Sequence, residues 1–200
     1  MPEDNHSTSF ANSEAYERFM GQWSRVSGRD FVRWLTLPDG LRWLDVGCGT
    51  GAFSQVILDL CAPSEVVGID PAEAQLAFAR ARISDGRTKF QAGDALDIPF
   101  DDNAFDVAAS ALVLNFVADQ NRMVAEMRRV VRPAGKVAAY VWDFAGGGEV
   151  AHHIGLTLAA RDPEEAKRAA AGLQAETTRL DTLAEVFSEA EIDRVSTQAI

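Results

Sequence analysis

From about residue 40 onward, the sequence alternates short apolar runs with segments of helical pattern, and this alternation constrains the fold more than any other feature. The apolar runs have the length of strands, and apolar residues recur at helical spacing between them. This order is typical of βαβ units, in which helices join parallel strands. We therefore predict an α/β fold that is Rossmann-like and doubly wound, with a mostly parallel sheet. The predicted strands are 41–46, 65–70, 88–93, 105–114 and 135–144, and the predicted helices are 52–61, 72–84, 120–131 and 179–190.

The two ends of the chain depart from this alternation. Residues 1–11 are polar and acidic, lack the basic and apolar regions of a signal peptide, and are interpreted as a flexible leader. Residues 12–200 are expected to form a single domain. Apolar positions at helical spacing predict two helices within 12–38 that pack on the sheet or close over a pocket, and 145–178 is expected to be a helical insertion. The stretch ending at Ile200 has a strand pattern without a following turn, so we expect the sheet to lack a final strand.

Charge and composition exclude several classes of partner. The chain has 200 residues and a formal net charge of −11, so it lacks the basic face that neutralises phosphates, and neither nucleic acid nor an anionic membrane is an expected partner. No apolar run approaches the roughly 18 residues that span a bilayer. Cys48 and Cys61 fit neither a metal-site spacing nor a disulfide framework. We therefore expect a cytoplasmic protein with reduced thiols and no metal site.

The loop after the first predicted strand, "LDVGCGTGAF", places three glycines at alternating positions. Gly47, Gly49 and Gly51 give GxGxG, and together with Ala52 they also satisfy the GxGxxG/A spacing of a dinucleotide-binding turn. Glycines between a buried strand and a helix let the backbone turn sharply and approach a ligand closely. The motif alone leaves three interpretations open: a phosphate cradle, a site for another adenosine cofactor, and a tight turn without a ligand.

Three aspartates follow or end successive predicted strands. Asp45 lies two residues before the first glycine, Asp70 ends the second strand, and Asp94 follows the third. In an open α/β sheet, the carboxyl ends of the strands form the edge at which ligands bind. A carboxylate such as Asp45 would repel a pyrophosphate, whereas it would attract a cationic group. Asp70 suits ribose hydroxyls in either kind of cofactor, so the three carboxylates together favour an adenosine that carries positive charge. A magnesium site is the competing interpretation.

Four quoted segments, in this order, carry a resemblance to a known family: "LDVGCGTG", "VVGIDPAEAQLAFARAR", "FQAGDALDIPFDDNAFDVAASALVLNFV" and "EMRRVVRPAGKVAAYVWD". They resemble the successive motifs of class I S-adenosylmethionine-dependent methyltransferases, in particular the small-molecule type 11 branch that includes quinone-biosynthesis C-methyltransferases. The resemblance covers about residues 12 to 144. It implies S-adenosylmethionine as cofactor, methyl transfer to a small molecule, and a seven-stranded sheet whose final strand this chain would lack.

The resemblance also implies which residues meet the amino-acid end of the cofactor. Gly47, Cys48 and Gly49 would pass along its methionine part, and Asp45 would lie near its ammonium group. Ser110, expected just past the fourth strand, would offer its backbone carbonyl to the same end.

For the adenosine end, the resemblance implies a second group of residues. Asp70 would accept the ribose hydroxyls, and Pro71 and Ala72 would line the adenine. Asp94 and Ala95 would meet the adenine edge. Each of these positions ends a predicted strand or lies within two residues after its end.

The acceptor side of the site is less defined by the sequence. Tyr16 and Trp23 of "YERFMGQW" resemble the lid that covers the cofactor in this family, although ordinary packing explains two aromatic residues equally well. Residues 145–178 would be the substrate-side insertion. Because the cofactor carries the reactive methyl group, the protein mainly positions and desolvates it, and no catalytic residue is predicted. Polar groups expected near an acceptor are Asn115, Trp142, Asp143, His152 and His153.

Two other functions remain open at this stage. The glycine motif together with Asp70 also fits an NAD-dependent oxidoreductase. The expected absence of a final strand and the undefined acceptor side fit a catalytically silent binding module with the same fold. The chain is expected to be a monomer or a homodimer, since an unpaired edge strand can template association.

Overall fold

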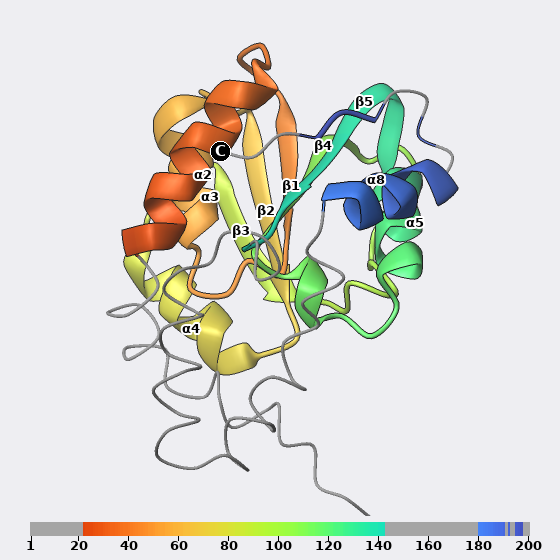
Figure 1. Ribbon diagram of the computed structural model, residues 1–200. Helices are drawn as coiled ribbons and strands as arrows, with labels where there is room; N and C mark the ends of the chain where they lie inside the picture. The colour runs from red at the N-terminus through yellow and green to blue at the C-terminus, as the bar shows by residue number, and fades with distance from the viewer. Residues whose placement is uncertain (1–21, 143–179, 191, 193–194, 198–200) are drawn as a thin grey trace, which may run out of the picture.

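The computed structural model describes residues 22–142, 180–190, 192 and 195–197, and these form a parallel sheet covered by helices on both faces (Figure 1). The strand order is β3-β2-β1-β4-β5, and every pair of neighbours is parallel. The chain thus runs outward to one edge and then returns to start again on the other side of β1. This topology confirms the predicted doubly wound α/β fold. The strands are β1 (Arg42–Val46), β2 (Glu65–Asp70), β3 (Thr88–Ala92), β4 (Phe105–Ala111) and β5 (Val131–Tyr140).

Five helices and one 3-10 turn lie around this sheet in the described part of the chain. One group of helices covers the face of the sheet on the left of Figure 1, and a second group, whose members pack against each other, covers the other face. The four helices predicted after the first strand agree with their observed counterparts to within two residues at each end. The first group is α2 (Gln22–Leu35), α3 (Ala52–Leu60) and α4 (Glu73–Arg82); the second is α5 (Gln120–Val130) and α8 (Leu180–Glu189), with the 3-10 turn η2 (Leu114–Phe116) before α5.

Side chains alternate between the two faces of the sheet, as the period of two in a strand requires. On β1, Trp43 is buried in the core beneath α2, α3 and α4, whereas Leu44 and Val46 are buried in the core beneath α5 and α8. Because Asp45 lies between Leu44 and Val46, its side chain is directed to the same face as Trp43. The alternation therefore turns this carboxylate toward α3.

Close packing of α2 depends on Gly28 and a group of aromatic rings. A Cβ on Gly28 would lie 3.1 Å from Phe53 of α3 and 3.3 Å from the Tyr140 hydroxyl of β5. The ring of Phe31 lies 4.8 Å from that of Tyr140 and 5.8 Å from that of Phe53, between centroids. The Tyr140 hydroxyl donates to the Ser24 carbonyl at 3.2 Å, so this buried polar group is satisfied. These contacts hold α2 against α3 and β5.

Two predicted strands differ from those observed. The prediction for β4 runs to residue 114, but the strand ends at Ala111 because Leu112 has a positive φ of 62°, which interrupts an extended backbone. The prediction for β5 starts at residue 135, but pairing with β4 already begins at Val131, immediately after α5.

The early start of β5 is made possible by an irregularity in its pairing. Phe105 pairs with Val131, but Val107 pairs with Lys136, so four residues of β5 bulge opposite one residue of β4. Gly135 closes this bulge, since a Cβ there would lie 2.5 Å from the Asp106 carbonyl oxygen. The residues between the predicted helix 120–131 and the predicted strand 135–144 therefore lie inside β5.

Several expectations for the chain ends lie partly or wholly outside the described residues. Residues 22–35 form one continuous helix rather than the end of one and the start of another. The remainder of the predicted N-terminal helix pair, the leader and all of 145–178 lie outside the described part. At the predicted closing strand, residues 192 and 195–197 are described and belong to no strand. Apolar alternation alone does not supply the neighbouring edge that a strand needs.

A row of alternating charges crosses the amino end of the sheet, with one residue from each strand. Lys89 contacts Glu65 at 2.6 Å, and Glu65 contacts Arg42 at 2.5 Å. The Arg42 amide donates to Asp106 at 2.7 Å, and Asp106 pairs with Arg132. These partners lower the pKa values of Glu65 and Asp106. The row joins the strands at the end opposite the glycine loop.

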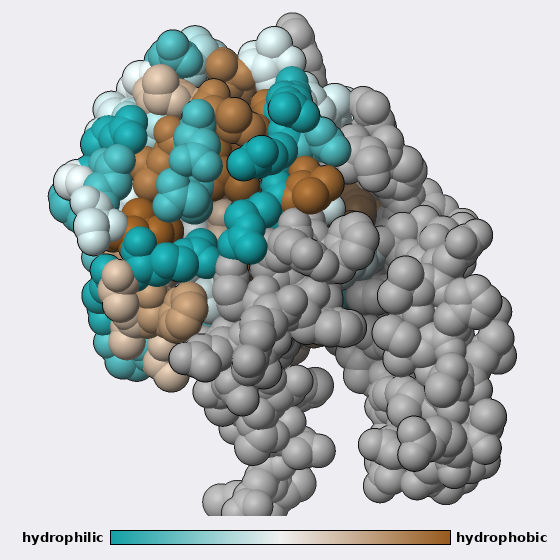
Figure 2. Space-filling view, turned by 90° about the vertical axis from the view of Figure 1, so that its left-hand side faces the viewer, coloured by the Kyte–Doolittle hydropathy of each residue, from teal (hydrophilic) through white to brown (hydrophobic). Residues whose placement is uncertain are grey.

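On the face that carries α2, α3 and α4, apolar surface is broken up by hydrophilic side chains (Figure 2). Val26 of α2 and Leu60 of α3 are exposed there, at 57% and 44% of their surface. Among the described helices, none combines the length and the apolar character that crossing a bilayer requires.

Candidate functional site

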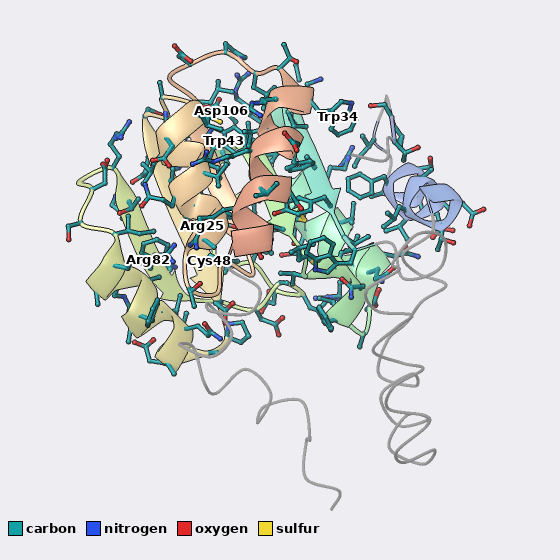
Figure 3. The ribbon with its side chains drawn as sticks, turned by 60° about the vertical axis from the view of Figure 1, so that its left-hand side comes forward. Arg25, Trp34, Trp43, Cys48, Arg82 and Asp106 are labelled. Atoms are coloured by element: carbon teal, nitrogen blue, oxygen red, sulfur yellow. The ribbon has the colours of Figure 1, made fainter. Side chains whose placement is uncertain are left out.

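The candidate site lies at the carboxyl ends of the strands, which point to the lower edge of the sheet in Figure 1. The strand order reverses between β1 and β4, and such a switch point is where open α/β sheets bind ligands. Figure 3 shows Cys48 of the glycine loop at the opposite end of the sheet from Asp106. The three predicted aspartates end or follow β1, β2 and β3, which are adjacent strands.

The glycine loop has a backbone that only glycine adopts without strain. Gly47, Gly49 and Gly51 have φ values of 74°, 52° and 76°. A Cβ on Gly47 would lie 2.6 Å from a methyl group of Val113, and one on Gly51 would lie 2.8 Å from Ile83. A Cβ on Gly49 would meet no described atom within 4 Å. Gly47 and Gly51 therefore serve packing, whereas Gly49 leaves open space beside the loop.

The backbone amides of the loop are used within the protein. Gly47 and Cys48 both donate to the Ile69 carbonyl at 2.9 Å, and Gly49 donates to a carboxylate oxygen of Asp70 at 3.0 Å. A phosphate cradle needs such amides to point at the ligand. These three amides instead tie the loop to the end of β2.

Asp45 of β1 is fully buried, and its side chain contacts the N-terminal turn of α3. The Ser54 hydroxyl donates to its Oδ2 at 2.6 Å, whereas Oδ1 has no hydrogen-bond partner among the described residues. Burial raises the pKa of Asp45 to about 7, and repulsion from Asp70 adds to this; hydrogen bonds from the Ser54 hydroxyl and backbone amide oppose it in part. A helix N-terminus attracts anions, and at the N-terminus of α3 the anionic group is the carboxylate of Asp45.

Asp70 is half-buried at the end of β2 and connects two loops. Its Oδ2 accepts the Gly49 amide at 3.0 Å, and its Oδ1 accepts the Ala72 amide at 2.8 Å. Burial raises the pKa of Asp70, and the two amides oppose this. Each carboxylate oxygen has two lone pairs, so each keeps one position for a further donor such as a ribose hydroxyl.

The remaining positions expected near the adenine lie in the loops after β2 and β3. Pro71 and Asp94 are exposed, and Ala72 and Ala95 are half-buried. Asp94 lies two residues beyond the end of β3, and its Oδ1 accepts the Leu96 amide at 2.8 Å. This turn leaves the second oxygen of Asp94 at the surface beside the end of β2.

Ser110 lies inside β4 rather than past it, because it pairs with Ala139 of β5. Its hydroxyl donates to the Val46 carbonyl at 3.0 Å, where direct pairing between β1 and β4 has ended. The side chain of Ser110 therefore joins the two strands at the switch point. Cys48 is buried, and burial keeps the pKa of its thiol well above the usual range, so the thiol stays protonated.

Several predicted positions fall outside the described residues. Tyr16, Asp143, His152 and His153 are outside them, and for Trp23 only the backbone in α2 is described. Trp142 is half-buried and packs against the core beneath α2 and α3.

Three residues that contribute to the site were not expected there or were not assigned a contact. Ser54 is the hydrogen-bond donor to Asp45, and its only signal in the sequence is a polar residue in the apolar helix "AFSQVILDL". Val113 covers Gly47 from the loop after β4. Asn115 is 1% exposed in η2, and neither atom of its amide has a partner among the described residues.

The polar groups at this edge are therefore mainly acceptors. The amides of Gly47, Cys48 and Gly49 are hydrogen-bonded within the protein. Among the described residues, Oδ1 of Asp45 has no partner, and the carboxylates of Asp70 and Asp94 keep lone pairs for further donors. Acceptors of this kind suit an ammonium group, hydroxyls and an exocyclic amine, and they repel a phosphate. S-adenosylmethionine offers these donors together with a positively charged sulfonium, so the residues present fit it.

Comparison with known proteins shows that the chain is similar to methyltransferases. Residues 44–139 match the protein family described as a methyltransferase domain. The chain is 37% identical over 109 residues to a sterol 4-C-methyltransferase of Caenorhabditis elegans, covering 53% of this chain and 32% of that protein. It is 34% identical over 132 residues to a demethylmenaquinone methyltransferase of Symbiobacterium thermophilum, covering 62% and 52%. The matches thus span about a third to a half of the length of these relatives.

Among solved structures, the fold is similar to that of phosphoethanolamine N-methyltransferase 2 of Haemonchus contortus in complex with S-adenosyl-L-methionine. The TM-score is 0.62 at 21% identity, and the match covers 80% of this chain and 35% of the other. At this identity the likeness concerns the fold alone.

Proposed function

We propose that the chain is a class I S-adenosylmethionine-dependent methyltransferase that transfers a methyl group from this cofactor to a small-molecule acceptor; the match of residues 44–139 to the methyltransferase-domain family supports this. The observation that carries the proposal is the polarity of the glycine loop. Its amides at Gly47, Cys48 and Gly49 are bonded to Ile69 and Asp70, and the N-terminus of α3 is occupied by Asp45. None of these three described amides is left to donate to a pyrophosphate, which disfavours an NAD-dependent oxidoreductase.

We assign to each carboxylate the part of the cofactor that its free hydrogen-bonding positions suit. The free Oδ1 of Asp45 would accept the ammonium group of the cofactor. The remaining lone pairs of Asp70 would accept the ribose hydroxyls, and Asp94 would accept the adenine amine. Gly49 would let the methionine part lie against the backbone, because no side chain of the described residues fills the space beside it.

When bound, the cofactor would supply a methyl group that its sulfonium activates for in-line displacement. The chain contributes by holding the donor in one orientation and by keeping water away from the reacting atoms. The carboxylates at the ends of β1 and β2 also place negative charge near the cationic donor. A general base is required only for an acceptor that must lose a proton.

Asn115 is the described residue best suited to contact the acceptor. It is nearly fully buried, both polar atoms of its amide lack a partner among the described residues, and its neighbour Val113 touches Gly47. A buried amide without partners is costly, so a ligand that bonds to it gains affinity. The names of the relatives, a sterol and a demethylmenaquinone methyltransferase, support a small acceptor with an extended apolar part and a polar group.

Titration calorimetry with S-adenosylhomocysteine tests the cofactor. We expect saturable binding to the full chain, at least tenfold weaker binding to Asp70→Ala, and unchanged binding to Asp101→Ala, which removes an exposed carboxylate away from this edge. No heat at millimolar ligand, or an Asp70→Ala variant that behaves like the wild type, would refute the proposal.

Two further measurements separate the alternatives. Quenching of tryptophan fluorescence by NADH, with no response to S-adenosylhomocysteine, would favour an oxidoreductase. Cofactor binding without methyl transfer to any of a broad panel of quinols, sterols and amines would favour a silent binding module. Transfer of a labelled methyl group to one class of acceptor, weakened by Asn115→Ala at unchanged cofactor affinity, is the result expected here.

A further inference from the structure

Ser54 and Asp45 form a buried pair that the glycine motif does not explain. Both side chains are fully buried, one on β1 and the other in the first turn of α3. The Ser54 hydroxyl lies 2.6 Å from Oδ2 of Asp45, which is the length of a strong hydrogen bond to a charged or partly charged oxygen. Because this bond fixes Oδ2 against the helix, the carboxylate group cannot rotate, and Oδ1 is left as the only available acceptor.

We propose that Ser54 is a positioning residue that holds Asp45 for the ammonium group of the cofactor, and that cofactor binding is linked to release of a proton from Asp45. This inference rests on the proposed function, and it adds a proton to the binding equilibrium. Below about pH 7, Asp45 in the unliganded protein would hold a proton on Oδ1, because Oδ2 accepts the Ser54 hydroxyl. On binding, that proton leaves to solvent and the ionised Oδ1 accepts the ammonium hydrogen bond.

The groups around Asp45 support this exchange. Its strand partners, Gly68 on β2 and Ala109 on β4, carry no charge. Cys48 remains a neutral thiol, and Asp70 is the one charged group among the described residues that shifts the pKa of Asp45. Asp70 is itself anionic and therefore disfavours a second charge nearby. Among the described residues no cation shifts the pKa of Asp45, and the guanidinium of Arg80 acts on Cys48 instead, so the carboxylate ionises readily only when a ligand brings positive charge.

The direction of the pH dependence follows from linkage. Burial raises the pKa of Asp45 to about 7, so protonated Asp45 predominates in the unliganded protein at pH 6. A ligand that requires the ionised form then binds about tenfold more weakly for each unit of pH below 7. The stability of the unliganded protein responds in the opposite direction: it declines as the pH rises through the pKa of Asp45, because ionisation leaves a buried charge.

Titration calorimetry with S-adenosylhomocysteine between pH 5.5 and 7.5 tests the linkage, since this ligand carries the same ammonium group. For the wild type we expect affinity to rise with pH and then level off near pH 7. Heats measured in two buffers of different ionisation enthalpy should show release of close to one proton at pH 6. In Asp45→Asn, which keeps the shape of the side chain, binding should be weaker at pH 7.5 and should no longer vary with this titration.

The role of Ser54 is tested by the pH at which affinity levels off. The Ser54 hydroxyl stabilises the ionised form of Asp45, so Ser54→Ala should move this pH upward, and Ser54→Thr, which keeps a hydroxyl, should restore it. A merely structural serine would lower the affinity or stability of Ser54→Ala at every pH without moving the midpoint. If Ser54→Ala does not fold, Ser54→Cys keeps a side chain of similar size with a weaker donor and gives the same test.

The outcomes separate this inference from the proposed function. A wild type that binds the ligand with no pH dependence, or an Asp45→Asn variant with the wild-type pH dependence, overturns the linkage while the function stands. A wild type that binds no S-adenosylhomocysteine at any pH overturns both. The melting temperature of the unliganded protein provides a readout without ligand: its decline between pH 5.5 and 7.5 should be smaller in Asp45→Asn.

Discussion

Replacing Gly47 by alanine tests whether the glycine loop is held in place by contact with the segment after β4. Gly47 has a φ of 74°, and a Cβ there would lie 2.6 and 2.7 Å from the two methyl groups of Val113. Gly49, two residues later, has a φ of 52°, but a Cβ there meets no described atom within 4 Å. The two alanine variants therefore share the backbone strain and differ in the steric overlap.

The two contributions are separable in magnitude. An L-residue in the left-handed region costs about 1–2 kcal/mol, and both variants should lose this amount. Overpacking costs about 1–3 kcal/mol, and only Gly47→Ala should lose it in addition. We therefore expect Gly47→Ala to reduce the free energy of unfolding by about 2–5 kcal/mol, and Gly49→Ala by about 1–2 kcal/mol.

Urea denaturation of the unliganded protein measures these losses, and a double-mutant cycle with Val113→Ala assigns the overlap. Removing the two methyl groups of Val113 should recover most of the difference between the glycine variants, so the cycle should show a coupling of about 1–3 kcal/mol. Equal losses for Gly47→Ala and Gly49→Ala, or a double variant without recovery, would refute the proposed contact between the loop and the segment after β4.

Three further predictions concern the frame around the site, each measured by denaturant unfolding. Gly135→Ala should destabilise the protein by more than about 3 kcal/mol, because the new Cβ would lie 2.5 Å from the rigid backbone oxygen of Asp106; a loss under about 1 kcal/mol would contradict the bulge. Arg129→Ala should cost about 2–3 kcal/mol, since this side chain bonds two backbone carbonyls and two carboxylates, whereas the exposed neighbour Arg128→Ala should cost much less; similar losses would contradict this. Asp106 has a lowered pKa, so its contribution to stability is present above the unfolded value of about 3.9 and is lost as the pH falls through the folded value. Asp106→Asn should therefore lose less stability than the wild type on acidification below about pH 4, and parallel acid profiles would show that the contribution is negligible.

Much of the architecture could be predicted from local patterns. The apolar runs and helical spacings indicated the parallel α/β fold, because burial on both faces of a sheet demands apolar strands joined by helices. The predicted boundaries of β4 and β5 were wrong for a physical reason. Leu112 ends β4 by adopting a positive φ, and β5 starts early by accommodating a bulge around Gly135. Both are responses to neighbouring backbone, and neither leaves a periodic signal.

The candidate site, like the fold, could be predicted from the sequence only in part. The spacing of Gly47, Gly49 and Gly51, and the positions of Asp70 and Asp94 after their strands, followed from the sequence because they depend only on where each strand ends. The assignment of these residues to parts of the cofactor remains a prediction. Trp23 and the residues expected on the acceptor side also remain predictions, with only Asn115 and Trp142 placed among described side chains.

By itself, the sequence determined that a glycine loop would join a buried strand to a helix and that carboxylates would gather at one edge of the sheet. Only the tertiary structure decided what each polar group is bonded to. The Ile69 carbonyl accepts hydrogen bonds from two loop amides, and Asp70 accepts one from a third. The Ser54 hydroxyl donates to one oxygen of Asp45. These partners come from β2 and α3, so they depend on how strands pair and on how a helix sits over the sheet. Long-range packing, which leaves no pattern in the order of residues, thus turned a motif shared with phosphate-binding loops into a site lined by acceptors.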